Sequence, residues 1–419
     1  MRSKLLKELC FEDKCGVYGI PATAEDFDEK KTRYLRITDI SEDGKLLNDS
    51  KKSVTSEDIE KYILEEGDIV FARTGNSTGK AYFHEAKNGR LAFAGFLIKY
   101  SLNPLLVNPK YIRYYSITKQ YKQWVENFSL GSTRGNINAQ SFGDCPIPLP
   151  ERIQQDSLVN VLSALDAKIQ LNNKINDNLE QMAKTLYDYW FVQFDFPDTN
   201  GKPYKTSGGK MVWSEDLRRE IPEDWNSILL GSIGNFKNGV NYDPSNPGNI
   251  ACPIINVRNI SASRYFLKNS DLDIIYLREA DVRKYAVHEG SIIIARSGIP
   301  GATRLISDFA ENTLYCGFAI HYELNDLSQK LPIFFYLKSI EEMIKNGSGG
   351  TILKNVNQGT LNNLKVALPK NKTITSKFNE LISPIFNKIN LIEKENQELS
   401  LLRDWLLPML MNGQVKVKD

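Results

Sequence analysis

Residues that hold metals or form disulfide frameworks are scarce in this sequence. The 419-residue chain contains five cysteines and three histidines, all scattered, with no Cys-x-x-Cys pair among them. An odd number of dispersed cysteines predicts neither a disulfide scaffold nor a zinc site. We therefore expect a protein of a reducing, cytoplasmic compartment that binds no metal of its own.

Long apolar runs and an excess of one charge are also lacking. No run approaches the length of a membrane span, and charged residues interrupt the first fifteen positions, so neither a signal peptide nor a membrane anchor is expected. The formal net charge of +2 excludes a histone-like coat of positive charge.

The charge is nevertheless unevenly distributed. Residues 25–68 contain 14 acidic and 8 basic side chains, whereas residues 69–140 contain 2 acidic and 10 basic ones. Two interpretations fit the second range: it contributes to a basic surface that binds nucleic acid, or its lysines and arginines solvate an ordinary surface.

Recognisable catalytic motifs are missing as well. The segment Gly75–Ala81 resembles a phosphate-binding loop, but it has one residue too few before Gly79-Lys80 and no hydroxyl side chain after the lysine. No Asn-Pro-Pro-aromatic sequence, the motif of an adenine methyltransferase, is present. We therefore expect no catalytic residue in this chain and a non-enzymatic role.

The most informative feature that is present is an internal duplication. Its period near 220 residues is much longer than that of solenoid repeats, so the chain contains two whole domains of one type. Three pairs of segments carry the duplication at offsets of 219 to 223 residues: Glu66–Gly75 with Glu289–Gly298, Ala94–Phe96 with Cys316–Phe318, and Asn136–Asn138 with Asn355–Asn357.

Apolar residues recur in steps of three and four after each domain, as in the seam between paired helices. About 30 residues of this periodicity, present twice, favour a coiled coil over a single core helix. The first series is Leu158, Leu162, Leu165, Ile169, Asn172, Asn176, Leu179, Ala183, Leu186 and Trp190, and the second is Phe378, Ile382, Ile385, Ile389, Ile392, Asn396, Leu399, Arg403, Leu406 and Leu410.

Two features of this seam leave alternatives open. Asn176 and Asn396 occupy equivalent positions, where a buried asparagine would fix the helix register and an exposed one would mark a frayed stretch. Pro384 lies in the second series, so that helix either begins there, with proline in its first turn, or kinks there.

The domains themselves are predicted to mix strands with a few helices. Asp68–Ala72 and Ser291–Ala295 are typical of buried strands, and an Arg-Thr-Gly or Arg-Ser-Gly turn follows each. We expect an α+β fold in which two similar mixed α/β domains are separated by two long antiparallel coiled-coil helices, in a pseudo-twofold, circularly repeated arrangement. The predicted parts are a first domain at 1–150, a helical spacer at 151–195, a linker at 196–219, a second domain at 220–370 and a C-terminal helix at 371–412.

Several motifs resemble those of the specificity subunits of Type I restriction-modification enzymes, and the resemblance spans the whole chain. The architecture of two domains and two helices is more specific than any one motif. The matching segments are Asn178–Ala183 with Leu186, Trp190-Phe191 and Phe194–Pro197, then Ile221–Trp225, Leu149-Pro150 and Leu368-Pro369 before the helices, and Leu407-Pro408 with Asn412-Gly413 near the C-terminus.

The resemblance implies a non-catalytic DNA-binding subunit. Each target-recognition domain would read one half of a bipartite site in double-stranded DNA, while the helices set the spacer and dock the modification subunits, usually two. Those subunits would bring S-adenosylmethionine and methylate adenine. Restriction subunits would add translocation and cleavage with ATP and Mg. A DNA-binding nuclease and a coiled-coil assembly scaffold without a DNA function are the alternatives.

Candidate DNA-binding residues are chosen by side-chain chemistry, because these groups bond to base edges or phosphates. Arg73 and Arg296 are equivalent across domains expected to read different sequences, which favours a structural or phosphate-binding role for them. The candidates are Arg36, Thr38, Arg73, Thr74, Asn76, Lys80, Arg134 and Asn136 in the first domain, and Arg258, Asn259, Arg296, Ser297, Arg304, Lys354 and Asn355 in the second.

Overall fold

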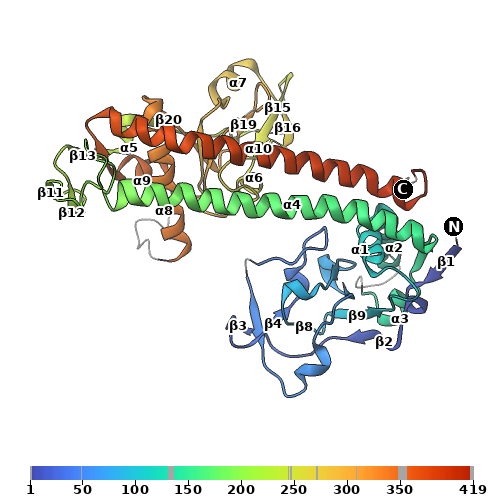
Figure 1. The fold of residues 1–419 in the computed structure, drawn as a ribbon. Helices are drawn as coiled ribbons and strands as arrows, with labels where there is room; N and C mark the ends of the chain where they lie inside the picture. The colour runs from blue at the N-terminus through green and yellow to red at the C-terminus, as the bar shows by residue number, and fades with distance from the viewer. Residues whose placement is uncertain are drawn as a thin grey trace. The chain divides into compact units, whose positions relative to one another are not determined.

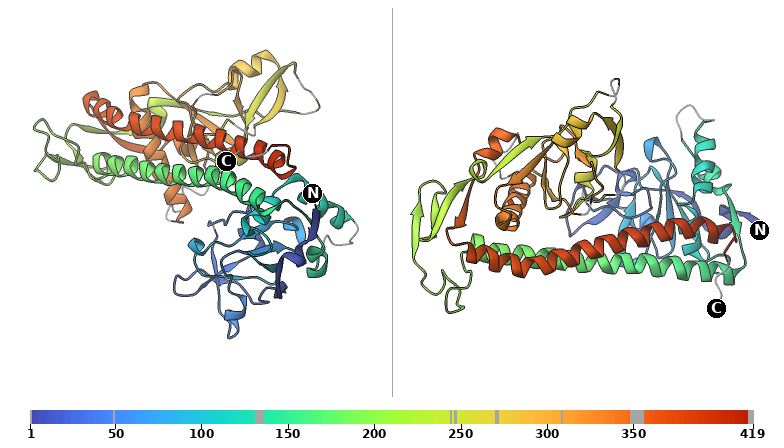
Figure 2. Two further views of the ribbon diagram at one scale, coloured as in Figure 1. Left: turned by 45° about the vertical axis from the view of Figure 1, so that its right-hand side comes forward. Right: turned by 90° about the horizontal axis from the view of Figure 1, so that it is seen from above.

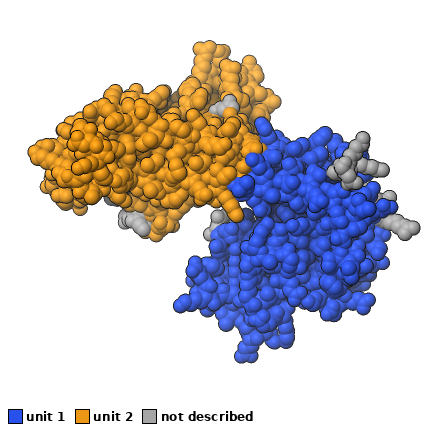
Figure 3. Space-filling model, in the orientation of Figure 1, with its two compact units in different colours: residues 1–171, 396–419 blue, residues 172–395 orange. Residues whose placement is uncertain are grey.

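The described residues form two compact units, coloured separately in Figure 3. Unit 1 comprises residues 1–171 and 396–419, and unit 2 comprises residues 172–395. Each unit therefore combines one globular domain with a segment of each long helix. The computed structural model describes residues 2–48, 50–130, 136–243, 245, 248–269, 272–307, 309–347 and 356–415.

The globular domain of unit 1 is built on two four-stranded sheets and one strand pair (Figure 1). The first sheet is antiparallel, in the order β2 (Cys10–Tyr18), β9 (Leu97–Leu102), β6 (Asp68–Ala72) and β7 (Ala81–Phe83). The second runs β3 (Glu25–Asp26), β5 (Lys52–Val54), β4 (Thr32–Leu35) and β8 (Leu91–Phe93), with β4 and β8 parallel. Strand β1 (Arg2–Leu5) pairs with β10 (Pro146–Leu149) and so joins the two ends of the domain.

Unit 2 repeats this topology, which confirms the two similar mixed domains. Its four-stranded antiparallel sheet runs β14 (Gly234–Asn238), β20 (Ala319–Leu324), β17 (Ile292–Ala295) and β18 (Thr303–Leu305). Strands β16 (Asp273–Leu277), β15 (Ile250–Ile255) and β19 (Leu314–Tyr315) form the second sheet, with β15 and β19 parallel. The closing pair is β13 (Trp225–Leu229) with β21 (Lys365–Pro369).

Short helices connect these sheets, and asparagines cap several of them. Asn138 accepts a hydrogen bond from the Ser141 N–H at the start of α3 (Ala139–Gly143), and Asn357 accepts one from the Thr360 N–H at the start of α9 (Gln358–Asn362). The repeated Asn-x-Asn motif thus supplies a helix cap in each unit. The other helices are α1 (Pro109–Tyr115), α2 (Lys119–Leu130), α5 (Leu230–Ile233), α6 (Val257–Ser261), α7 (Glu279–Tyr285) and α8 (Lys330–Lys345).

The long helices are α4 (Arg152–Tyr187), which ends in a π-turn at Asp188–Val192, and α10 (Lys372–Met411). Within each unit their segments lie antiparallel and side by side (Figures 1 and 2). In unit 2 the Asn172 side chain donates to Glu395 at 2.8 Å, and the Trp190 and Phe378 rings are 5.7 Å apart. Helix α10 begins at Lys372, so Pro384 lies in the interior of the helix sequence and not in its first turn. The proline itself is exposed.

Each helix segment packs into the core of its own domain rather than forming a separate layer. In unit 1, Leu158 and Leu162 of α4 and Leu410 of α10 belong to the cluster that contains Phe71 and Tyr111. In unit 2, α4 and α10 contribute to an aromatic-rich cluster with α8. Because burial of these apolar faces is the main stabilising term, each domain and its helix segments form one folding unit.

The predicted linker contains more structure than expected. Strand β11 (Met211–Ser214) lies inside the predicted 196–219 segment and pairs with β12 (Arg219–Pro222) as a hairpin. The composition rich in glycine, proline and lysine predicted a loop, whereas the short Met-Val-Trp run pairs with a strand that crosses the predicted boundary at residue 219.

Candidate nucleic-acid interface

Three of the predicted basic residues are already neutralised by a neighbouring carboxylate. Such a cation must give up its partner before it can bind a phosphate oxygen, so its first role is to hold surface loops together. The pairs are Arg36 with Asp39 at 2.7 Å, Lys80 with Glu42 at 2.7 Å, and Arg258 with Asp273 at 2.6 Å.

Arg304 and Asn259 are buried, which corrects their prediction as DNA contacts. Only 4% of Arg304 is exposed, and its guanidinium donates to the Ile260, Ser263 and Thr303 carbonyls as well as to Glu341 at 2.9 Å. Asn259 is buried, and its side chain accepts a hydrogen bond from the Asn256 N–H. Both residues act inside the domain because their hydrogen-bonding capacity is used there.

The predicted polar residues differ in exposure. Thr38, Asn76 and Asn136 are exposed, whereas Thr74 and Ser297 are half-buried. Arg134, Lys354 and Asn355 lie outside the described residues. The exposed hydroxyl and amide groups keep the hydrogen-bonding capacity that base or phosphate contacts require.

Arg73 and Arg296 differ from the other basic candidates that the structure describes, because neither forms an ion pair with any described carboxylate. The Arg73 guanidinium lies 4.9 Å above the Tyr18 ring, and its Nε atom is buried without a hydrogen-bond partner among the described residues. The Arg296 guanidinium donates to the Gly317 carbonyl at 3.0 Å. Both arginines therefore keep an unneutralised positive charge at a half-buried position, which is suited to binding phosphate.

The two arginines occupy the same place in the two domains. Arg73 follows the end of β6 and donates its backbone N–H to the Phe96 carbonyl at 3.0 Å. Arg296 follows the end of β17 and donates its N–H to the Phe318 carbonyl at 2.9 Å. We call each of these places, where the arginine after the strand is bonded to the phenylalanine carbonyl, the junction of its domain. Because each junction lies at the end of a strand in a four-stranded sheet, its backbone is held rigidly.

Sequence reasoning missed Tyr18, which supports Arg73. Its ring stacks under the guanidinium, and its hydroxyl accepts a hydrogen bond from the Ala139 N–H at 3.1 Å. The available signal was the position of Tyr18 directly before Gly19, a glycine that Gly239 repeats 220 residues later. The tyrosine has no aromatic counterpart, because Asn238 stands there in the second domain.

The predicted seam residues lie mostly in the interior, and Asn176 is buried, with its Oδ1 atom lacking a hydrogen-bond partner among the described residues. The frayed, exposed alternative therefore does not describe Asn176. Buried members are Leu158, Leu162, Ile169, Asn172, Asn176, Ala183, Trp190, Phe378, Ile382, Ile385, Ile389, Ile392, Arg403 and Leu410, and half-buried members are Leu165, Leu179, Leu186, Asn396, Leu399 and Leu406.

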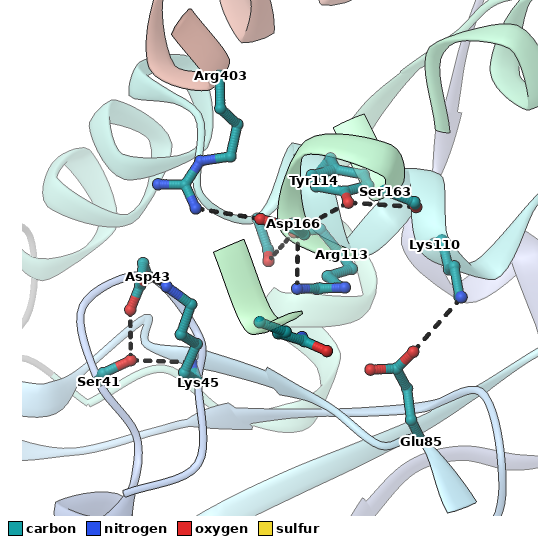
Figure 4. Close-up of polar contacts among 12 residues, drawn as sticks. Ser41, Asp43, Lys45, Glu85, Lys110, Arg113, Tyr114, Ser163, Asp166 and Arg403 are labelled. Carbon is teal, nitrogen blue, oxygen red and sulfur yellow. Dashed lines mark hydrogen bonds and ion pairs between the residues drawn. The ribbon is translucent and has the colours of Figure 1, made fainter. Parts of the chain in front are cut away.

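A polar cluster centred on Asp166 joins the helices of unit 1 to its globular domain (Figure 4). The Asp166 carboxylate accepts from Arg403 of α10 at 3.2 Å, and from Arg113 and Tyr114 of α1 at 3.1 and 2.8 Å. The Tyr114 hydroxyl also contacts Ser163. Sequence reasoning placed Arg403 in the seam but missed Asp166, because a charged residue beside Leu165 reads as part of the solvated face.

A second cluster in unit 2 contains carboxyl groups with altered pKa values. The pKa of Glu393 is raised to about 7, chiefly by burial; Lys268 and Arg264 act to lower it, and the charge of Glu180 acts to raise it. Burial also raises the pKa of Glu180. Arg264 forms an ion pair with Asp177 and lies 3.7 Å from Glu180. Helix α10 of this unit therefore carries a half-buried carboxyl group whose pKa lies near neutral pH.

Among the described residues, no three or more histidine, cysteine, aspartate or glutamate side chains are arranged to hold a metal ion. In the same part of the chain, no helix is both long enough and apolar enough to cross a membrane.

Comparison with protein families matches both halves of the chain. The model described as the Type I restriction modification DNA specificity domain matches residues 6–181 and again residues 222–401. Each match covers one globular domain and most of the helix that follows it.

Individual relatives and a solved structure extend this match. The Type I restriction enzyme MjaIX specificity subunit of Methanocaldococcus jannaschii is 26% identical over 322 residues, which cover 74% of this chain and 70% of that subunit. The HindI specificity subunit of Haemophilus influenzae is 22% identical, over 85% of this chain and 88% of that subunit. The Type-I restriction-modification system S subunit from M. genitalium has a similar fold, with a TM-score of 0.53, 16% identity and coverage of 98% of this chain and 95% of that one.

Proposed function

This chain belongs to the family of Type I restriction-modification DNA specificity domains, and we propose that it directs its complex to a bipartite site in double-stranded DNA. Each globular domain reads one half of the site. The observation that carries the proposal is the repeated junction at Arg73 and Arg296, where each domain presents one unneutralised cation from an equivalent position. Two copies of one DNA-contacting surface require two half-sites.

The helices have two roles in this proposal: they set the spacer between the half-sites, and they dock the modification subunits. The outer faces of the helix segments support the docking role, because they carry large apolar side chains that nothing in the described chain covers. Exposed apolar area on a helix marks a protein interface. These residues are Ile153, Leu171, Leu401, Leu402 and Trp405 in unit 1, and Met182, Leu381 and Leu391 in unit 2.

The chemistry belongs to the partners. The modification subunits, two per complex, bring S-adenosylmethionine and methylate adenine. Restriction subunits use ATP and Mg for translocation and cleavage. This chain contributes no catalytic group and selects the DNA on which those subunits act.

The experiment that tests this function is selection from random-sequence DNA. The full chain is purified with its modification subunits and mixed with duplexes containing a long randomised segment, and bound DNA is separated by electrophoresis and sequenced. Enrichment of two short sequences at one fixed separation supports the proposal. Bound DNA without any common sequence contradicts it.

The same assay distinguishes the two alternatives. An assembly scaffold without a DNA function retards no duplex at low salt, where even non-specific phosphate contacts are strong. A nuclease cleaves the duplexes when the chain is present with Mg but without any partner subunit.

A further inference from the structure

A phenylalanine side chain is held out from the surface at the same place in both units. Phe96 is 60% exposed and Phe318 is 63% exposed. Each is the third residue of a four-residue turn, closed by a hydrogen bond from Leu97 N–H to the Ala94 carbonyl at 2.8 Å or from Ala319 N–H to the Cys316 carbonyl at 2.9 Å. The residues that close each turn are buried, so only the ring projects.

A neighbouring segment braces each turn. Gly19 donates its N–H to the Leu97 carbonyl at 3.1 Å, and Gly239 donates to the Ala319 carbonyl at 3.1 Å. A side chain at either glycine would bring its Cβ within 2.2 Å of a carbonyl oxygen, that of Ala94 or Cys316. Only glycine permits so close an approach. The two rings are therefore fixed to rigid backbone, which removes much of the entropy that ordering them on a ligand would cost.

Each ring adjoins one of the two arginines described above, Arg73 in the first domain and Arg296 in the second. The backbone N–H of Arg73 is bonded to the Phe96 carbonyl, and that of Arg296 to the Phe318 carbonyl. A cation and a projecting aromatic ring thus leave the same junction in both units. This combination matches DNA, in which an anionic backbone borders the apolar faces of stacked bases.

On the basis of the proposed function, we propose that Phe96 and Phe318 are apolar wedges that insert against the base stack, one in each half-site, beside phosphates bound by Arg73 and Arg296. The family resemblance implies that the two domains read different sequences, and a feature that both retain is then suited to contact something common to all DNA. Every base offers a π-face, and an inserted ring unstacks a base step without reading it. Such unstacking lowers the cost of extruding an adenine for methylation.

The test uses the full chain assembled with its modification subunits and a duplex carrying its selected site. The variants Phe96→Ala and Phe318→Ala are compared with Phe96→Trp and Phe318→Trp, which keep a ring. Matched controls are Leu105→Ala and Leu327→Ala. Leu105 is 89% exposed and follows the end of β9, and Leu327 is 67% exposed and follows the end of β20, whereas the two phenylalanines precede the starts of these strands. Methylation is measured separately at each half-site, and 2-aminopurine in place of each target adenine reports unstacking by its fluorescence.

We expect Phe96→Ala to slow methylation by about tenfold to a hundredfold at the first half-site alone, with loss of the 2-aminopurine signal there. Phe318→Ala has the same effect at the second half-site. The tryptophan variants recover most of the rate, the leucine controls behave as wild type, and the recognised sequence is unchanged in every variant.

Two results would overturn the proposal while leaving the proposed function intact. The first is wild-type methylation and fluorescence in both alanine variants. The second is a changed recognition sequence, which would make these residues base readers. A wild-type complex that prefers no split sequence would instead overturn the proposed function, and the wedge proposal with it.

Discussion

The charges of Arg73 and Arg296 are the most direct link between single residues and DNA affinity. We expect Arg73→Ala or Arg296→Ala to weaken binding to specific and non-specific duplexes alike, because a phosphate contact carries no sequence information. The slope of log affinity against log salt concentration should fall by about 1 for each variant. Binding titrations of the assembled complex at several salt concentrations measure this.

Matched arginines outside the junctions serve as controls for that experiment. Arg152 in unit 1 and Arg283 in unit 2 are exposed and already paired with Asp156 and Glu279. Their alanine variants should keep the wild-type slope. An unchanged slope in the Arg73 and Arg296 variants would remove both residues from the DNA interface.

The half-buried carboxyl group of Glu393 predicts a pH-dependent stability. Its pKa is raised to about 7 in the folded chain, so between its ordinary value and pH 7 the folded state binds a proton that the unfolded state has lost. The free energy of unfolding therefore falls as pH rises through this window. Glu393→Gln removes the effect and should stabilise unit 2 at pH 8, by about 3 kcal/mol at most.

Thermal unfolding of the wild type and the variant across pH 5 to 8 tests this expectation. The melting temperatures of the wild type and the variant should be nearly equal at pH 5 and should separate as the pH rises. Melting temperatures that stay parallel over the whole range would show that Glu393 does not titrate in the folded chain.

At the residue scale, the sequence could not distinguish candidate side chains that are buried from those that remain accessible. Arg304 looked like Arg73 in the sequence, but it is paired with Glu341, 37 residues away, and is buried. Nothing local to Arg304 shows that partner, because helix α8 brings it there. Arg73 and Arg296 could be selected only by the internal repeat, which placed both at the same turn.

Among the elements, the joint between α4, α10 and α1 in unit 1 depends on Asp166. Asp166→Asn leaves Arg403 and Arg113 without their buried carboxylate, so we expect unit 1 to be destabilised by about 3–5 kcal/mol. Arg403→Gln should also destabilise the unit. The double variant should cost less than the sum, because each single change already removes the Asp166–Arg403 contact and the double variant loses it only once.

Urea unfolding of the full chain and of these three variants measures the coupling. In unit 2 the position equivalent to Asp166 is Phe386, which packs among aromatic rings instead of ions. Phe386→Leu is therefore a control without an ionic component. Strictly additive effects of the Asp166 and Arg403 changes would contradict a direct interaction between them.

The elements themselves were predictable to different degrees. Both long helices followed from a periodicity that the cores of the two units require, and α10 begins and ends within one residue of the predicted 371–412 range. Helix α10 passes through Pro384, since packing along both flanks outweighs the lost hydrogen bond. Strand β11 was missed because a strand of four residues takes its stability from its partner and not from its own sequence.

For the whole molecule, assembly should depend on the exposed apolar face of α10. Leu401 and Trp405 are one helical turn apart and both are largely exposed. We expect the double variant Leu401→Glu with Trp405→Glu to lose co-purification with the modification subunits while the chain remains folded. Trp213→Glu changes an equally exposed tryptophan, 58% against 57%, in the β11–β12 hairpin, and should leave assembly intact. Equal recovery of partner subunits in both variants would exclude this face as the docking surface.

The central claim is that two similar domains in one chain select one split DNA site for methylation. The most direct measurement is long-read mapping of methylated adenine in host DNA with and without the gene, with the modification subunits present in both strains. The account predicts that deletion abolishes methylation at one motif, made of two short sequences around a fixed gap, and that the restored gene returns it. An unchanged methylation pattern in an expressed and assembled system would contradict the account.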